Sequence, residues 1–437
     1  MSTPPYIELH AHSAFSFLDG ASSPLELAGA AAALGYPALA LTDHDGIWGS
    51  MEFAHCAKGL GLRPITGAEL TVRLPVEESD GKVSSRHGGA PAGAHFAHLT
   101  LLVEDGDGYR NLCRLLTAAH SHTRDNTPRV AEPPWTTPAE VERHAAGLVC
   151  LSGCARDGAL AGAFGRGDTA LGERLGRRLL AAFGRERFRV ELQRPYWRRD
   201  RARNRWLALL AERLGVPTVA TGNVHAHARS RSHAQDALVA IGLNETLESS
   251  EPRRRGNSMS ALASPAAMAA RFAEHPGAVA ETVRLAERLR FDLTTDLGYR
   301  YPREEDADVK LAELCHSRLA ENYPTRKGRR EAEGRLEQEL TTIHKLGLSA
   351  FFLLHHRLLE LARTVPTVLV IHLERPAVLP ELVDACAAVL AVFGSSDEAV
   401  LDLVFGRARP EGRLPFELPS SMAAVEEMLT MLPRLWR

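Results

Sequence analysis

Side chains that ligate metal ions recur along this chain, each time directly after a short apolar run. In chain order, these residues are His10 and His12, Asp43 and His44, Glu69, Cys154, and Asn223 and His225. The carboxyl ends of the strands in a β/α barrel meet at one mouth, so side chains that follow successive strands converge there. Histidine, aspartate, glutamate and cysteine gathered in one place indicate a metal centre.

The alternation of apolar runs and helical stretches predicts an α/β fold. Seven strand candidates lie near 6–10, 38–42, 64–66, 98–103, 147–152, 188–192 and 217–221. Helices are expected between them at 24–34, 48–60, 108–119, 170–183 and 201–214. Such an alternation implies a parallel sheet, and right-handed crossovers curl it toward a barrel. Seven units are one fewer than in the common eight-fold barrel.

We expect three parts along the chain. A metal-binding barrel occupies 1–229, a helical region 230–363, and a partial α/β domain 364–437. Within the barrel, 75–95 is rich in glycine and serine and is expected to be a long flexible insertion.

The two later parts carry their own patterns. At 331–346 the residues Leu336, Leu340 and Ile343 recur at the spacing of an amphipathic helix. The apolar run at 366–373 predicts a buried strand, and a helix and a second strand follow it.

Composition bounds the class of protein. The chain has 437 residues and a net charge of -2, so nucleic-acid affinity must come from local patches. One such patch, at 196–206, interleaves arginines with aromatic residues, although an ordinary solvated helix start explains it equally well. The six cysteines form no framework, which is typical of a reducing cytosol. Neither a secretory signal nor an apolar run of about 20 residues is visible, so we expect a cytoplasmic protein without a membrane partner.

The ligand types indicate the chemistry of the centre. Mixed imidazole and carboxylate ligands suit Zn²⁺, Mn²⁺ or Fe²⁺ better than Mg²⁺ alone, although Mg²⁺ stays an alternative. Two or three such ions suit hydrolysis of phosphate esters. For Cys154 a plain buried thiol is the alternative, and Asp43 could orient His44 instead of ligating. His98 starts its strand, which does not fit convergence at the strand ends. The remaining barrel histidines, at 55, 87, 95, 120 and 227, carry no pattern and are expected at the surface.

Several phrases resemble a known family. The chain is similar to the PHP (polymerase and histidinol phosphatase) domain, and within that superfamily to bacterial C-family DNA polymerases of the error-prone type. The resemblance spans about 5–363 and rests on Glu8-Leu-His-Ala-His-Ser, Phe15-Ser-Phe-Leu-Asp-Gly-Ala-Ser, Ala40-Leu-Thr-Asp-His-Asp-Gly, Gly67-Ala-Glu-Leu, His98-Leu-Thr-Leu-Leu, Leu151-Ser-Gly-Cys, Thr221-Gly-Asn-Val-His-Ala-His, Gly298-Tyr-Arg-Tyr-Pro and Leu346-Gly-Leu-Ser-Ala-Phe-Phe-Leu-Leu.

The resemblance implies a distorted seven-fold barrel in which nine side chains hold up to three metal ions. Carried over residue by residue, these are His10, His12, Asp19, His44, Glu69, His98, Cys154, Asn223 and His225. Asn223 departs from the family, which has aspartate there in its fully active form. An amide oxygen carries no charge, so we expect one metal to bind less well. We assign catalytic roles to His12, Glu69 and His225.

The far end of the chain departs from the polymerase family. After Arg363 such a polymerase continues into its palm, but neither a Gly-Arg-Gly-Ser loop nor an Asp-x-Asp pair follows. Instead, 366–422 resembles the C-terminal domain of family-three glycoside hydrolases. The matching phrases are Val368-Leu-Val-Ile-His-Leu-Glu-Arg-Pro, Phe405-Gly-Arg-Ala-Arg-Pro-Glu-Gly-Arg-Leu-Pro-Phe and Leu418-Pro-Ser-Ser. We expect a fusion of two fragments that adds neither glycosidase nor polymerase activity.

The leading hypothesis is a metal-dependent phosphoesterase, similar to a 3′–5′ exonuclease and to the N-terminal part of an error-prone polymerase. The resemblance implies DNA as partner, single-stranded or at a primer 3′ end, together with DNA-repair or replication proteins. A non-catalytic polymerase scaffold is the first alternative. A small-molecule phosphatase of the histidinol-phosphatase type is the second, although such an enzyme would have no use for the helical region.

Overall fold

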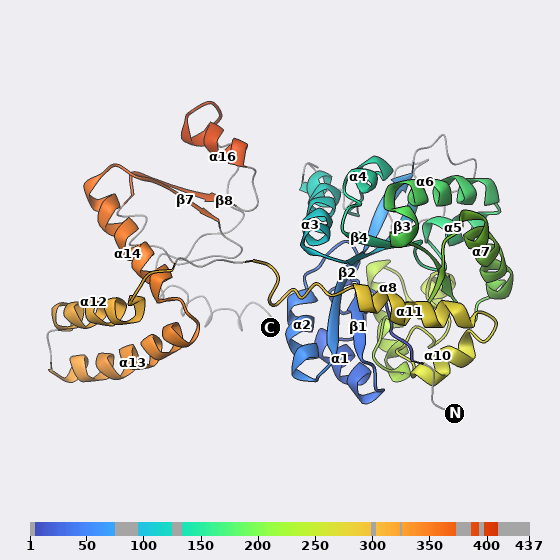
Figure 1. Ribbon diagram of the computed structural model, residues 1–437, viewed down its shortest axis with the longest axis horizontal. Coiled ribbons are helices and arrows are strands. Elements are labelled where there is room, and N and C mark those ends of the chain that lie inside the picture. The colour runs from blue at the N-terminus through green and yellow to red at the C-terminus, as the bar shows by residue number, and fades with distance from the viewer. Residues whose placement is uncertain are drawn as a thin grey trace. The chain divides into compact units, whose positions relative to one another are not determined.

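A computed structural model describes residues 5–74, 95–124, 133–298, 303–323, 326–372, 386–392 and 397–409. The chain divides into two compact units, Met1–Gly298 and Tyr299–Arg437, and each is described by itself (Figure 1). The expected insertion at 75–95 lies outside the described residues except for His95. Among the described residues, no helix has both the length and the apolar character needed to span a bilayer.

The first unit is built around a six-stranded sheet. Its strands run in the order β1 to β6, which is also their order in the chain. Their bounds are β1 Ala38–Leu41, β2 Arg63–Leu74, β3 His95–Val103, β4 Leu148–Leu151, β5 Phe188–Gln193 and β6 Thr218–Thr221. Each expected strand from 38–42 onward is therefore present, and β2 is much longer than its expected span of 64–66.

The segment expected as the first strand pairs through isolated bridges. Glu8 bridges to Leu39 of β1, and Ala11 bridges to Val224 just after β6. The main chain of His12 also donates a hydrogen bond to the Val224 carbonyl at 2.8 Å. The segment thus lies between the two edge strands of the curled sheet. Contact on both sides places His10 and His12 beside the ends of β1 and β6.

The expectation of an all-parallel sheet is wrong for β3. The pairs β1–β2, β4–β5 and β5–β6 are parallel, whereas β3 runs antiparallel to both β2 and β4. Parallel neighbours need a crossover connection, usually a helix. The sequence carries no helical stretch between 66 and 98, so β2 and β3 pair as neighbouring antiparallel strands.

Helices surround the sheet and confirm the predicted periodic segments (Figure 1). Their bounds are α1 Pro24–Ala33, α2 Ser50–Gly59, α3 Gly106–Ser121, α4 Pro138–Arg143, α5 Ala159–Arg166, α6 Thr169–Arg187, α7 Asp200–Leu214, α8 Ser232–Gly242, α9 Leu247–Ser250, α10 Pro265–Arg271 and α11 Pro276–Arg288. Local signals set their ends, as at α1. Ser23 and Glu26 form a capping box there, and Pro24 opens the first turn.

The inner face of the sheet changes from apolar to polar along the strands. An apolar cluster joins alternate strand residues to one side of α11, namely Ile7, Leu9, Ala38, Ala40, Ile65, Leu102, Val149, Leu151, Val219, Leu285, Ala286 and Leu289. Side chains two residues apart share a face of a strand. Glu69 therefore lies on the face of Ile65, and His98 on the face of Leu102. Glu69 and His98 thus continue the face of this apolar cluster toward the ends of their strands.

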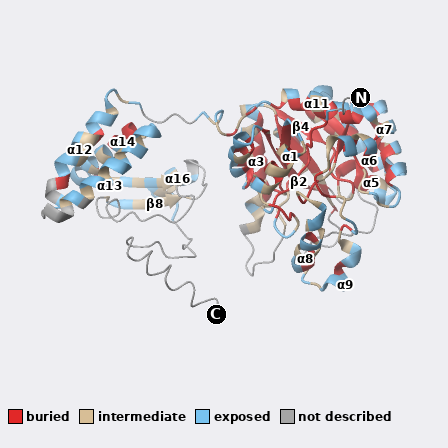
Figure 2. Ribbon diagram, turned by 90° about the horizontal axis from the view of Figure 1, so that it is seen from below, coloured by how far each residue is buried: buried red, intermediate tan, exposed pale blue. Residues whose placement is uncertain are grey.

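The second unit holds four helices and a parallel strand pair in its described part. These are α12 Ala307–Asn322, α13 Arg326–Lys345 and α14 Ser349–Thr364, followed by β7 Val368–His372, β8 Ala388–Val392 and α16 Asp397–Val404. The predicted stripe Leu336, Leu340 and Ile343 is half-buried on α13. This unit buries far fewer side chains than the strands of the first unit (Figure 2).

Candidate metal centre

The reversed direction of β3 explains how His98 reaches the ligand cluster. Because β3 is antiparallel, its first residues lie beside the last residues of the parallel strands. Thr71 of β2 is paired with His98, and Glu69 with Thr100. His44, just after β1, bridges to Glu69 as well. Ligands that follow β1 and one that begins β3 therefore meet at the same edge.

Glu69 stands at the middle of the cluster and is almost completely buried. Its Oε2 lies 2.7 Å from Nε2 of His10. Its Oε1 lies 3.0 Å from Nδ1 of His44 and 2.7 Å from Nδ1 of His98. Each oxygen of the Glu69 carboxylate thus faces a different set of imidazoles.

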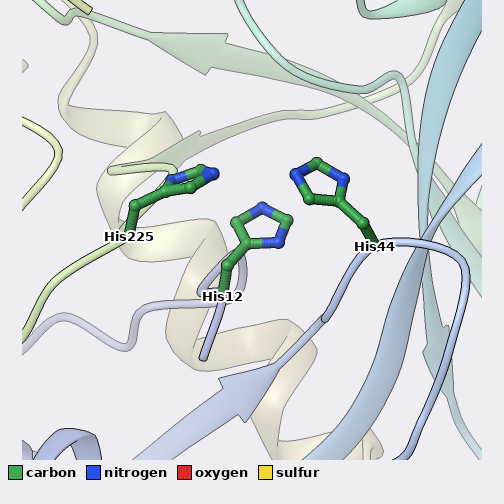
Figure 3. A group of neighbouring side chains, drawn as sticks. All are labelled: His12, His44 and His225. Atoms are coloured by element: carbon green, nitrogen blue, oxygen red, sulfur yellow. The ribbon is translucent and has the colours of Figure 1, made fainter. Parts of the chain in front are cut away.

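Three histidines from separate parts of the chain gather beside Glu69. His12, His44 and His225 turn their rings toward one another (Figure 3). The ring of His12 lies 4.3 Å from that of His44 and 4.2 Å from that of His225, measured between centroids. Nδ1 of His12 is 3.3 Å from the Ser16 hydroxyl, which leaves Nε2 directed at the shared space.

His98 also contacts Cys154, which follows β4. The Cys154 sulfur lies 3.7 Å from Nδ1 of His98, and Asp157 completes a third group of ligand types. Gly153 is required for this approach. Its φ is 89°, and a Cβ there would lie 1.9 Å from the His98 carbonyl oxygen.

Asp19 lies beside His44 and His225. Its Oδ2 lies 3.2 Å from Nε2 of His44 and 3.2 Å from Nε2 of His225. The Arg255 guanidinium also donates to it, at 3.2 Å to Oδ1 and 3.0 Å to Oδ2. The same guanidinium nitrogen contacts Nε2 of His225. Asp19 and His225 thus share a protein cation.

Asn223 sits at the turn after β6 with a φ of 47°. Its side-chain oxygen is buried and receives no hydrogen bond from a described residue. Its main-chain carbonyl accepts from Nδ1 of His225 at 3.0 Å, which orients that ring. A ligand role for the amide oxygen stays a prediction.

A buried carboxylate behind His10 is not among the residues predicted from the sequence. Glu191 of β5 accepts a hydrogen bond from Nδ1 of His10 at 2.7 Å and another from Gln193 at 2.7 Å, and it also contacts Thr221. A signal existed, since 188–193 alternates apolar with polar residues. His95, expected at the surface, is buried at the start of β3.

The predicted role of Asp43 beside His44 needs correction. Its carboxylate accepts hydrogen bonds from the Ser13 main chain at 2.6 Å and from the Ser16 hydroxyl at 2.7 Å. Because Ser16 in turn contacts His12, Asp43 fixes the loop that orients His12 rather than the ring of its own neighbour.

Charges in the cluster are strongly coupled. Burial lowers the pKa of His10, but the Glu191 and Glu69 carboxylates outweigh it and raise that pKa well above the ordinary value. Burial and neighbouring imidazoles lower the pKa of His12 well below the ordinary value. Burial and the Arg255 charge lower the pKa of His225 to about 4, which keeps that imidazole neutral.

These donors fit divalent ions. Four groups of three ligand atoms each lie within 4.8 Å: His12, His44 and His225; His10, His12 and Glu69; His44, Glu69 and His98; and His98, Cys154 and Asp157. Nε2 of His12 is buried and forms no hydrogen bond within the described part of the chain, and Nε2 of His10 and both Glu69 oxygens are buried with only one another and neighbouring imidazoles at close range. Buried polar atoms without hydrogen bonds are costly, and cations at their common centres would satisfy them.

The sequence was compared with protein families and with curated proteins. Residues 8–195 match the family model of the PHP domain. Error-prone DNA polymerase of Symbiobacterium thermophilum is 35% identical over 383 residues, covering 82% of this chain and 32% of its own length. That of Mycolicibacterium paratuberculosis is 35% identical over 366 residues, covering 83% of this chain and 32% of its own length. Residues 8–195 are therefore similar to the PHP domain, and about four fifths of the chain is similar in sequence to error-prone DNA polymerases.

The sequence match covers only part of each polymerase relative. The chain spans about a third of these curated relatives. Among solved structures, an amidohydrolase from Chromobacterium violaceum matches at 21% identity with a TM-score of 0.32, covering 50% of this chain and 87% of that one.

Proposed function

We propose that the first unit is a metal-dependent phosphoesterase that removes nucleotides from the 3′ end of single-stranded DNA. Its ions would be held by Glu69 and the residues around it, namely His10, His12, His44, His98 and Cys154. Asp19, Asn223 and His225 line an adjoining corner of the same centre. The polymerase relatives and the donor set support a phosphodiester substrate.

The position of Glu69 carries the proposal. A buried carboxylate whose two oxygens each lie 2.7 Å from a different imidazole is suited to hold divalent cations together with those imidazoles. Paired divalent ions would activate water at neutral pH and stabilise the attacking and leaving oxygens of a phosphodiester.

The chain's own residues organise the rest of the reaction. Glu191 holds the ring of His10, and Ser16 holds that of His12, so both present Nε2 to the centre. Burial keeps His12 and His225 neutral, the protonation state in which an imidazole donates its lone pair. His12, Glu69 and His225 are the residues we expect hydrolysis to depend on most.

Exposed aromatic rings beside the centre support a nucleic-acid substrate. Phe17 lies two residues before Asp19 and is 73% exposed, and Trp48 lies four residues after His44 and is 52% exposed. Their ring centroids are 6.2 Å apart. Aromatic side chains of this kind stack with the bases of single strands.

A nuclease assay tests the proposal. A single-stranded oligonucleotide labelled at its 5′ end should shorten from the 3′ end with Mn²⁺, and a chelator should stop the reaction. His12→Ala should abolish shortening, and Asn223→Asp should increase it because an aspartate adds a charged ligand. His55→Ala, on the exposed side of α2, is the matched control and should retain full activity.

Two outcomes would contradict this function. Full activity in His12→Ala would assign the hydrolysis to another site. A metal-loaded protein that cleaves no phosphodiester would instead support the non-catalytic scaffold.

We propose no nucleotidyl transfer or glycosidase activity for 364–437. Its sequence has no Gly-Arg-Gly-Ser loop and no Asp-x-Asp pair, and the likeness of 366–422 to a glycoside hydrolase domain is only a sequence likeness. Extension of a primer by the purified chain would contradict this part of the proposal.

A further inference from the structure

Arg255 places a cation inside the proposed metal centre. The residue is only 7% exposed, although arginine is rarely buried. One guanidinium nitrogen donates to both oxygens of Asp19 and contacts Nε2 of His225. These are the atoms with which Asp19 and His225 would ligate a metal.

Trp197 and Arg156 hold the main chain of the loop that carries Arg255. The Trp197 indole donates to the Arg255 carbonyl at 2.9 Å. Arg156 donates to the carbonyls of Arg253 at 2.8 Å and Arg254 at 3.1 Å, and its guanidinium lies 4.7 Å from the centre of the Trp197 ring. The main chain at 253–255 is therefore held in place by these hydrogen bonds, whatever contacts its side chains form.

A guanidinium and a metal ion compete for this corner. A lone pair of His225 or Asp19 that faces an N–H group is not directed at a metal at the same time. Guanidinium stays charged at every physiological pH, so the carboxylate is already neutralised. The adjoining side chain, Asn223, adds no charge that would draw in a further ion.

We propose that Arg255 takes the place of one divalent ion, so that the centre holds two ions around Glu69 and none between Asp19 and His225. The inference rests on the proposed function, because it presumes that the Glu69 corner is a metal site. It assigns to Arg255 the role of a fixed cation that positions Asp19 and His225.

Metal counting on the full chain tests the proposal. Protein saturated with Mn²⁺ and freed of excess ions by gel filtration is analysed for manganese and protein. The wild type should hold about two ions per chain, as in a paired site. Arg255→Met should hold one ion more, because Asp19 and His225 become available. Arg254→Met is the control, because Arg254 lies in the same loop as Arg255 but pairs with Asp236 of α8 at 2.7 Å. This variant should hold as many ions as the wild type.

The outcomes separate this inference from the proposed function. A wild type that holds three ions, or an Arg255→Met variant with an unchanged count, overturns the role of Arg255 but leaves the phosphoesterase standing. A wild type that binds no manganese overturns both. If Arg255→Met fails to fold, Arg255→Gln removes the same charge and is judged by the same count.

Discussion

Replacing Glu191 by glutamine should weaken metal binding without emptying the site. The substitution keeps the size of the side chain but removes the charge that accepts the proton of His10 at 2.7 Å. A hydrogen bond to a charged group contributes about 1.5–3 kcal/mol and a neutral one about 0.5–1.5 kcal/mol, so the middles of the two ranges imply a loss of about 1.3 kcal/mol. If the loss falls on the ligating form of His10, affinity drops about ten-fold. This lies within the range known for carboxylates behind metal-binding histidines.

The assay is a competition for Zn²⁺ between the metal-free protein and a chromophoric chelator at neutral pH. Glu104→Gln is the matched control, because Glu104 binds Arg187 and Arg288 on the outside of the first unit. The control should keep the affinity of the wild type. An unchanged affinity in Glu191→Gln would refute the reasoning that His10 ligates through Nε2 while Glu191 orients it.

Three further predictions concern the substrate and the stability of the first unit. Trp48→Ala should raise KM for a single-stranded oligonucleotide about five-fold with kcat unchanged, because an exposed stacking ring contributes about 1 kcal/mol; an unchanged KM would remove the aromatic subsite. Gly153→Ala should lower the free energy of unfolding by at least about 1–3 kcal/mol in a denaturant titration, since its φ of 89° is strained for alanine and the added Cβ would lie 1.9 Å from the His98 carbonyl oxygen; an unchanged midpoint would contradict this. Lys58 and Thr294 hold the pKa of Asp292 at about 2 against the opposing effect of burial, so this carboxylate stabilises the fold above its ordinary pKa and loses that effect as pH falls toward 2. Asp292→Asn should therefore cost about 1 kcal/mol at neutral pH, and the difference from the wild type in urea titrations should shrink in acid, whereas a constant difference would refute the assignment.

Much of the centre was predictable because the ligands follow apolar runs. His10, His12, His44, Glu69 and His225 all lie where the strand-end argument places them. His98 does not fit convergence at the strand ends if every strand is parallel. The reversal of β3 resolves the conflict, and its signal was the missing helix between β2 and β3.

Other features could not be predicted from local pattern. Arg255 belongs to a run of arginines that is typical of a solvated surface, yet it reaches Asp19 from 236 positions away. Only the path of the loop after α9 and the support from Trp197 bring it there. Glu191 could have been predicted more readily, because the alternation at 188–193 puts Arg189, Glu191 and Gln193 on one face of the strand, opposite the apolar residues.

The presence of ions at Glu69 is the central claim, and anomalous scattering from crystals loaded with Mn²⁺ tests it most directly. The account predicts anomalous peaks within about 2.0–2.3 Å of Glu69 oxygens, one shared with His10 and His12 and one with His44 and His98. Crystals that scatter anomalously only at other positions, or that show Glu69 bound to its histidines without any ion under saturating manganese, would contradict it.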